Sequence, residues 1–133
     1  MNPFLMFFAM LFLHIIDDYV LQGVLARLKQ ESWWRENAPD ELYKDDYVMA
    51  LYEHGFEWSF MVHLPFFILL LQSSNLFQIF IYVILVCGQA ILHAGIDHAK
   101  ANKHTINQIA DQMFHIGQIV FSCVVIAIAI ALI

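Results

Sequence analysis

The sequence predicts an all-α, polytopic membrane protein: a four-transmembrane-helix bundle with an amphipathic cytoplasmic helix between the first two spans. Of its 133 residues, 61% are apolar and only 14% are charged, whereas about a quarter of the residues of a soluble domain are charged. The apolar residues form four separate runs, 3–22, 56–72, 76–99 and 106–133. About 20 apolar residues, and at least about 17, span a bilayer as a helix. We therefore expect one membrane domain over residues 1–133.

The first run, residues 3–22, is expected to be retained as a membrane helix. A signal peptide has a basic segment before its apolar stretch and a small-residue cleavage site after it, and this run has neither. It also contains three ionisable residues, His14, Asp17 and Asp18.

The connection of residues 23–55 is long enough to form structure outside the membrane. Trp33 and Trp34 are typical of a headgroup boundary, and Pro39-Asp40 indicates a turn with a helix cap. After this turn, apolar and aromatic residues recur at helical spacing: Tyr43, Tyr47, Ala50, Leu51 and His54. An amphipathic helix lying on the inner membrane surface is the structure that this pattern favours.

The basic residues predict the orientation. Arg27, Lys29, Arg35 and Lys44 lie in the first connection, Lys100 and Lys103 lie at the third, and residues 73–75 contain none. Basic connections face the cytoplasm, so both termini are expected outside. With only 6 Lys and Arg against 12 Asp and Glu, the chain has no broad basic surface, and nucleic acid is not expected as a partner.

Each predicted span contains polar residues that are costly in a membrane. An Asp near the bilayer centre costs about 2.5 to 3.5 kcal/mol on insertion scales. Four pairs are spaced by four residues and so share a helix face: His14 with Asp18, Ser59 with His63, His93 with Asp97, and Asp111 with His115. Counted from the cytoplasmic ends, all four histidines lie roughly 10 to 14 Å deep. This common depth predicts one convergent site.

Neutral imidazole and carboxylate groups in a membrane interior indicate a metal site, because a divalent ion offsets the buried negative charge. The candidate ligands are His14, Asp18, His63, His93, Asp97, Asp111 and His115. This donor set favours zinc, and other divalent transition metals remain open. A catalytic zinc usually takes three protein ligands, so the others are left to orient ligands, to act as a base or to hold a second ion.

Other ionisable residues are expected to lie outside this site. Asp17 is offset by about 100° from Asp18 around the helix, which favours an interfacial or supporting position. Glu53, His54 and Glu57 lie at the expected membrane boundary, where a solvated role is favoured over ligation.

Three motifs resemble a known family. They are His14-Ile-Ile-Asp-Asp18-Tyr-Val-Leu-Gln22, His93-Ala-Gly-Ile-Asp97-His-Ala-Lys100 and Asp111-Gln-Met-Phe-His115. They are similar to H-x-x-x-D-[FY]-x-L-Q, H-x-x-x-D-x-x-K and D-Q-x-x-H in small bacterial and phage membrane proteins classed as a domain of unknown function. The resemblance implies a four-helix fold in the bacterial inner membrane, with His63 as the second-helix histidine. A weaker resemblance is to membrane proteins predicted to be metal-dependent hydrolases.

The leading hypothesis is an intramembrane metal-dependent hydrolase acting on a lipid or lipid-linked ester, amide or phosphoester from the cytoplasmic side. Metal coordination would make a bound water nucleophilic. Asp18 or Asp97 would act as the base, and Lys100 would engage an anionic headgroup. The Trp33–Trp34 segment and the amphipathic helix would form a lid.

Two hypotheses from other classes stay open. A proton or metal-ion conductor would use the same polar stripes, but the outward halves of the spans are almost wholly apolar, which favours a one-sided pocket. A non-enzymatic phage or host-membrane interaction protein would use a structural metal and contact its partner through the acidic connection. A homodimer is compatible with a bundle of this size.

Overall fold

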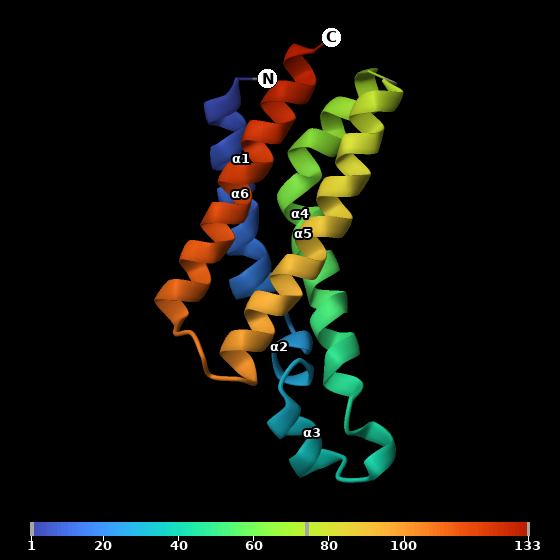
Figure 1. Cartoon of the computed structure of the whole chain (residues 1–133), viewed down its shortest axis with the longest axis vertical. Coiled ribbons are helices and arrows are strands. Elements are labelled where there is room, and N and C mark those ends of the chain that lie inside the picture. The colour runs from blue at the N-terminus through green and yellow to red at the C-terminus, as the bar shows by residue number, and fades with distance from the viewer. Residues whose placement is uncertain (1, 74, 133) are drawn as a thin grey trace.

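The computed structural model describes residues 2–73 and 75–132, and within these ranges the chain is helical, without strands (Figure 1). Four helical stretches are long and apolar enough to cross a membrane: Pro3–Leu21, Glu41–Ser73, Leu76–Ala101 and Gln108–Ala131. The predicted all-α architecture with four such helices is therefore confirmed at this level.

Asparagine side chains cap three of these helices. Helix α1 (Pro3–Ile16) begins after Asn2, α5 (Leu76–Ala101) after Asn75, and α6 (Gln108–Ala131) after Asn107. Each side-chain oxygen accepts a hydrogen bond from a backbone N–H of the first turn, which otherwise lacks a partner. The expected start of the fourth helix at residue 106 is therefore correct to within two residues.

Helix α4 (Asp46–Ser73) corrects the expected second span. It begins ten residues before residue 56, so the expected separate amphipathic helix is the first part of α4. The helix continues through Gly55, which lies against α5: a Cβ atom at this position would be 2.5 Å from the Ala90 carbonyl oxygen. The close approach carries the first turns of α4 along α5 rather than away from the bundle.

The connection before α4 folds into short helices: α2 (Leu25–Leu28), α3 (Glu31–Asn37) and the 3₁₀ turn η2 (Glu41–Tyr43). The predicted cap at Asp40 is confirmed, because its side chain accepts from Leu42 N at 2.9 Å. Asn102, just after α5, donates to the Lys29 carbonyl oxygen at 3.0 Å and accepts from Glu31 N at 2.7 Å. These two bonds fasten the connection to the end of α5.

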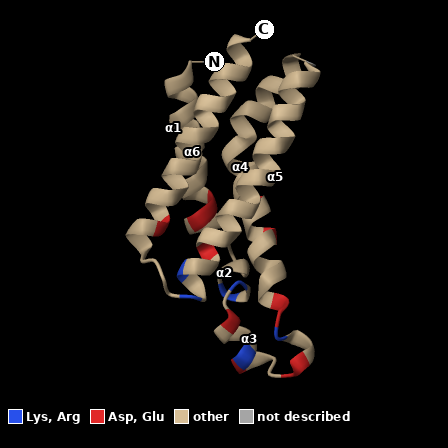
Figure 2. Cartoon of the chain, in the orientation of Figure 1, with Lys and Arg blue, Asp and Glu red and all other residues tan. Residues whose placement is uncertain are grey.

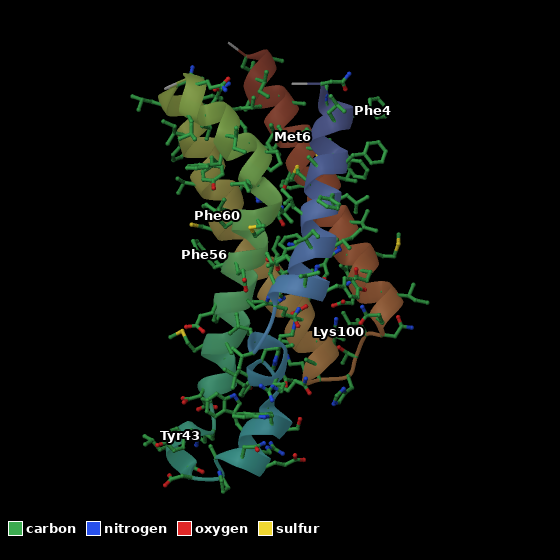
Figure 3. The ribbon with its side chains drawn as sticks, turned by 180° about the vertical axis from the view of Figure 1, so that it is seen from behind. Phe4, Met6, Tyr43, Phe56, Phe60 and Lys100 are labelled. Atoms are coloured by element: carbon green, nitrogen blue, oxygen red, sulfur yellow. The ribbon has the colours of Figure 1, made fainter. Side chains whose placement is uncertain are left out.

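The two ends of the bundle differ in charge. Both termini lie at one end, and the connections of residues 22–45 and 102–107 lie at the other (Figure 1). Lys, Arg, Asp and Glu gather toward the second end, called the charged end below (Figure 2). Figure 3 shows Phe4 projecting from α1 near the termini and Tyr43 at the charged end. Phe4 is 76% exposed, and large apolar side chains cover much of the outer surface.

An apolar core makes up most of the buried interior in the half of the described bundle nearer the termini. It includes Met6, Met10, Trp58, Val62, Phe66, Leu70, Tyr82, Leu85, Val86, Ile119 and Ile126. Trp58 forms its boundary with the polar residues, because its ring stacks on His93 with centroids 4.2 Å apart.

Candidate metal centre

A cluster of imidazole and carboxylate groups lies between Trp58 and the charged end. The His/Asp cluster, as we name it, consists of His14, Asp17, Asp18, His54, His93, Asp97, Asp111 and His115. Their side chains are 0 to 8% exposed. Helical spacing explains the convergence, because residues three or four apart share a face: Met6, Met10, His14 and Asp17 form the buried stripe of the first stretch. Six of the seven residues expected to converge belong to this cluster; His63 does not, and Asp17 and His54 are added.

Three atoms at the centre of the cluster have the spacing of ligands on one ion. His54 Nε2 lies 3.2 Å from His93 Nε2 and 3.5 Å from Asp97 Oδ2, and His93 Nε2 lies 3.8 Å from Asp97 Oδ2. Two nitrogens on a tetrahedral zinc are about 3.3 Å apart, given Zn–N bonds of about 2.0 to 2.1 Å. Asp18 Oδ1 lies 3.8 Å from His54 Nε2 on another side. These residues are therefore arranged as potential metal ligands.

Two overlapping groups of three have ligand atoms close enough together to hold a metal ion. One is Asp18, His54 and His93, and the other is His93, Asp97 and His115, each with its ligand atoms within 4.8 Å of one another. Asp111 lies beside the second group, with Oδ1 3.4 Å from His115 Nε2.

Many polar atoms of the cluster lack a hydrogen-bond partner among the described residues, although they are fully buried. They are both carboxylate oxygens of Asp17, Asp18 Oδ1, His54 Nδ1, His93 Nδ1, Asp111 Oδ1 and His115 Nε2. Burying such groups unpaired is costly, and buried charges in proteins are paired or coordinate metals. Cations bound at the cluster would supply partners for three of these atoms, Asp18 Oδ1, Asp111 Oδ1 and His115 Nε2, so the donor set fits a divalent metal ion.

Two lysines partly neutralise the carboxylates. Lys29 donates from Nζ to Asp97 Oδ2, and Lys100 donates to Asp111 Oδ2, each at 2.5 Å. Figure 3 shows Lys100 on the part of α5 nearest the charged end. Lys29 is only 6% exposed, and sequence reasoning missed it as a site residue. No spacing in the sequence singles it out, because its position depends on the connection folding back under α5.

His14 has no free ring nitrogen. Trp58 donates from Nε1 to Nδ1 of His14 at 2.8 Å, and Nε2 of His14 lies 3.2 Å from the Gln112 side-chain oxygen. Because an amide oxygen only accepts, Nε2 carries the hydrogen. The Gln112 nitrogen in turn donates to Asp18 Oδ2 and Asp111 Oδ2, each at 3.2 Å. His14 is thus linked through Gln112 to the carboxylates of Asp18 and Asp111, and its expected role as a ligand stays a prediction.

His63 lies outside the cluster, contrary to its expected place in the metal site. Its Nδ1 lies 2.7 Å from the Ser59 carbonyl oxygen, to which it donates, and its Nε2 accepts from the Ser122 hydroxyl at 3.0 Å. Both nitrogens are therefore paired with neutral groups. This histidine joins α4 to α6.

His54 is a correction in the opposite direction, whereas Asp17 has the supporting position that was one of its two expected places. His54, expected to be solvated, is fully buried because α4 begins early and turns this residue toward α5. Asp17 is also fully buried, because it lies three residues after His14 on the same stripe. At this point α1 passes into a π turn, η1 (Asp17–Leu21), in which Gln22 N bonds to Asp17 O at 3.0 Å. The turn keeps Asp17 and Asp18 both in the cluster, with Asp17 Oδ2 3.9 Å from His54 Nδ1.

A cavity of about 470 Å³ connects the cluster to the charged end. Its lining includes the cluster carboxylates Asp18 and Asp97, the two lysines Lys29 and Lys100, and Gln22. Ala26 and Gln30 line it from the connection, whereas Trp33 and Trp34 are not part of the lining. In place of the two tryptophans, which were expected to form part of a lid, Ala26, Lys29 and Gln30 line the cavity from the connection.

Comparisons with protein-family models, curated proteins and solved structures give no match to this chain. The resemblance of its three motifs to a family of unknown function stays a prediction.

Proposed function

We propose that this chain is an integral membrane protein whose His/Asp cluster binds a divalent transition metal, and that it hydrolyses a lipid or lipid-linked substrate. The observation that carries the proposal is the group formed by Asp18, His54 and His93, whose buried ligand atoms converge beside a polar cavity. Three protein ligands and one open position are typical of catalytic zinc. Zinc is therefore the metal we propose.

The cavity reaches this group at Asp18, one of its lining residues. Gln22 also lines it, and its amide nitrogen, which only donates, lies 3.1 Å from His54 Nε2, so a metal at Nε2 would replace this hydrogen bond. A bound transition-metal ion supplies an acidic water at neutral pH. Asp18 would hold the ion through Oδ1, which has no hydrogen-bond partner among the described residues, while its Oδ2 accepts from Gln112.

The proposed substrate follows from the surroundings of the cavity. Lys100, whose side chain is 26% exposed, lines it and is suited to pair with an anionic headgroup. The apolar outer surface fits lipid chains, and the positive-inside rule orients the charged end to the cytoplasm. A lipid or lipid-linked ester, amide or phosphoester is the class that this combination favours.

A conductor is supported less well. Conduction needs a polar path between both ends, but in the half of the described bundle nearer the termini most buried residues are apolar, and Ser59, His63 and Ser122 are bonded to one another or to backbone oxygens. The cavity reaches the cluster from the charged end.

Elemental analysis tests the metal, and a hydrolysis assay tests the activity. The purified full chain in detergent micelles is expected to retain stoichiometric zinc and to release product from fluorogenic ester, amide or phosphoester lipids. His93→Gln should abolish both readouts. His63→Gln is the matched control, because it changes a histidine that is equally buried but lies outside the cluster. Absence of bound metal from the wild-type chain, or equal metal in His93→Gln, would contradict the proposal.

A further inference from the structure

The hydrogen atom on the His115 ring can be assigned from its neighbours. Gln118 donates from Nε2 to the Gln89 backbone oxygen at 3.2 Å and to the Gln89 side-chain oxygen at 2.7 Å. A backbone oxygen only accepts, so the orientation of the Gln118 amide is determined. Its Oε1 lies 3.0 Å from His115 Nδ1. Nδ1 is therefore the nitrogen that carries the hydrogen.

The other nitrogen of His115 then faces two carboxylate oxygens. Nε2 lies 3.5 Å from Asp97 Oδ1 and 3.4 Å from Asp111 Oδ1, in a fully buried position. In the neutral ring Nε2 presents a lone pair, which the negative oxygens repel. Nε2 and Asp111 Oδ1 also have no hydrogen-bond partner among the described residues. A cation among these three atoms would convert the repulsion into attraction.

We propose that Asp97, Asp111 and His115 hold a second divalent metal ion, next to the first. This inference rests on the proposed function. Asp97 lies between the two positions, because its Oδ2, which also accepts from Lys29 at 2.5 Å, faces His54 and His93 while its Oδ1 faces His115. The structure thus assigns Asp97 as a carboxylate that bridges a two-ion centre.

The groups around the second position support a bound ion. Lys100 pairs with Asp111 through Oδ2, the oxygen that does not face His115, so Oδ1 is left for the ion. The Gln118 bond to Nδ1 is the kind of partner that orients a metal-ligating imidazole. Two-ion sites place their metals about 3.5 to 4 Å apart and stabilise both the attacking and the leaving oxygen of a displacement.

Metal stoichiometry tests the inference. The full chain is stripped with a chelator, reloaded with excess zinc, freed of unbound metal and analysed for zinc per chain. We expect two ions in the wild-type chain, one in His115→Gln and two in the control His63→Gln. One ion in the wild-type chain would mean that His115 holds a proton instead, which overturns the inference and leaves the proposed function intact. No ion would overturn both.

A measurement on the unaltered chain guards against variants that do not fold. Loaded with Mn²⁺, adjacent ions bridged by Asp97 are expected to give an exchange-coupled electron paramagnetic resonance spectrum. A spectrum of isolated Mn²⁺ at full loading contradicts the bridge, and a folded His115→Gln chain that still binds two ions contradicts the ligand assignment.

Discussion

His63 and His115 are both buried histidines on membrane-length helices, yet their surroundings differ. His63 lies between a backbone carbonyl and a serine hydroxyl, and both of its nitrogens are paired. His115 is paired at Nδ1 only, and its Nε2 faces Asp97 and Asp111. Identical side chains thus serve as a cross-link between helices in one place and as a potential ligand in the other. The difference lies in the partners contributed by other helices.

The largest expected effect comes from Asp97→Asn, which removes one of the two carboxylates that face His115 Nε2. The substitution preserves shape but removes the negative charge that faces Lys29, His54 and His115. Loss of a bridging ligand should weaken zinc binding by at least about 100-fold. Competition with a chromophoric chelator measures the affinity. An unchanged affinity would mean that Asp97 serves only as the partner of Lys29.

Gly55→Ala should separate α4 from α5 near the cluster rather than near His63. The added Cβ would lie 2.5 Å from the Ala90 carbonyl oxygen, so the backbones must move apart, at a cost of about 1 to 3 kcal/mol. Thermal unfolding in micelles should show the loss, together with weaker zinc binding. The control is Gly95→Ala on α5, where a Cβ meets no atom within 4 Å. Equal stability of the two variants would contradict the close approach.

Gln118→Leu tests the assigned hydrogen of His115. Without the acceptor at Nδ1, the imidazole is no longer held in the form that presents a lone pair at Nε2. Changes of this kind typically cost about 10- to 100-fold in metal affinity, and the loss should appear in the second step of a zinc titration. Gln118→Glu retains an acceptor and should restore part of the affinity. A titration of Gln118→Leu identical to the wild type would refute the assignment.

The smallest effect is expected at His63. Ser122→Ala removes one hydrogen bond between α6 and α4, and such bonds average about 0.6 kcal/mol in a membrane protein. The melting temperature should fall slightly, with no change in zinc stoichiometry. Loss of zinc from Ser122→Ala would show that His63 is coupled to the metal centre after all.

The sequence predicts the four long helices and most of the cluster, for reasons visible at particular residues. Apolar runs and four-residue spacing are local patterns, and they place His93 with Asp97, and Asp111 with His115, on single faces. The roles of His14 and His63 could not be predicted, because each has hydrogen-bond partners on another helix. Trp58 and Gln112 bond to His14, and Ser122 bonds to His63. The sequence places His54 at the membrane boundary because charged residues precede it, whereas α4 begins at Asp46 and includes this histidine. Lys29 reaches Asp97 only after the connection folds back.

The π turn at Asp17–Leu21 sets the rotation about the helix axis of the residues after it relative to those before it. A π turn adds one residue to an α-helix. Deleting an exposed residue of that turn, such as Tyr19 at 64% exposure, is expected to return the segment to a regular α-helix. Asp17 and the residues after it would then follow a different rotation about the axis. A single insertion or deletion here is therefore expected to change how Asp17 and Asp18 face the His/Asp cluster, while their side chains remain the same.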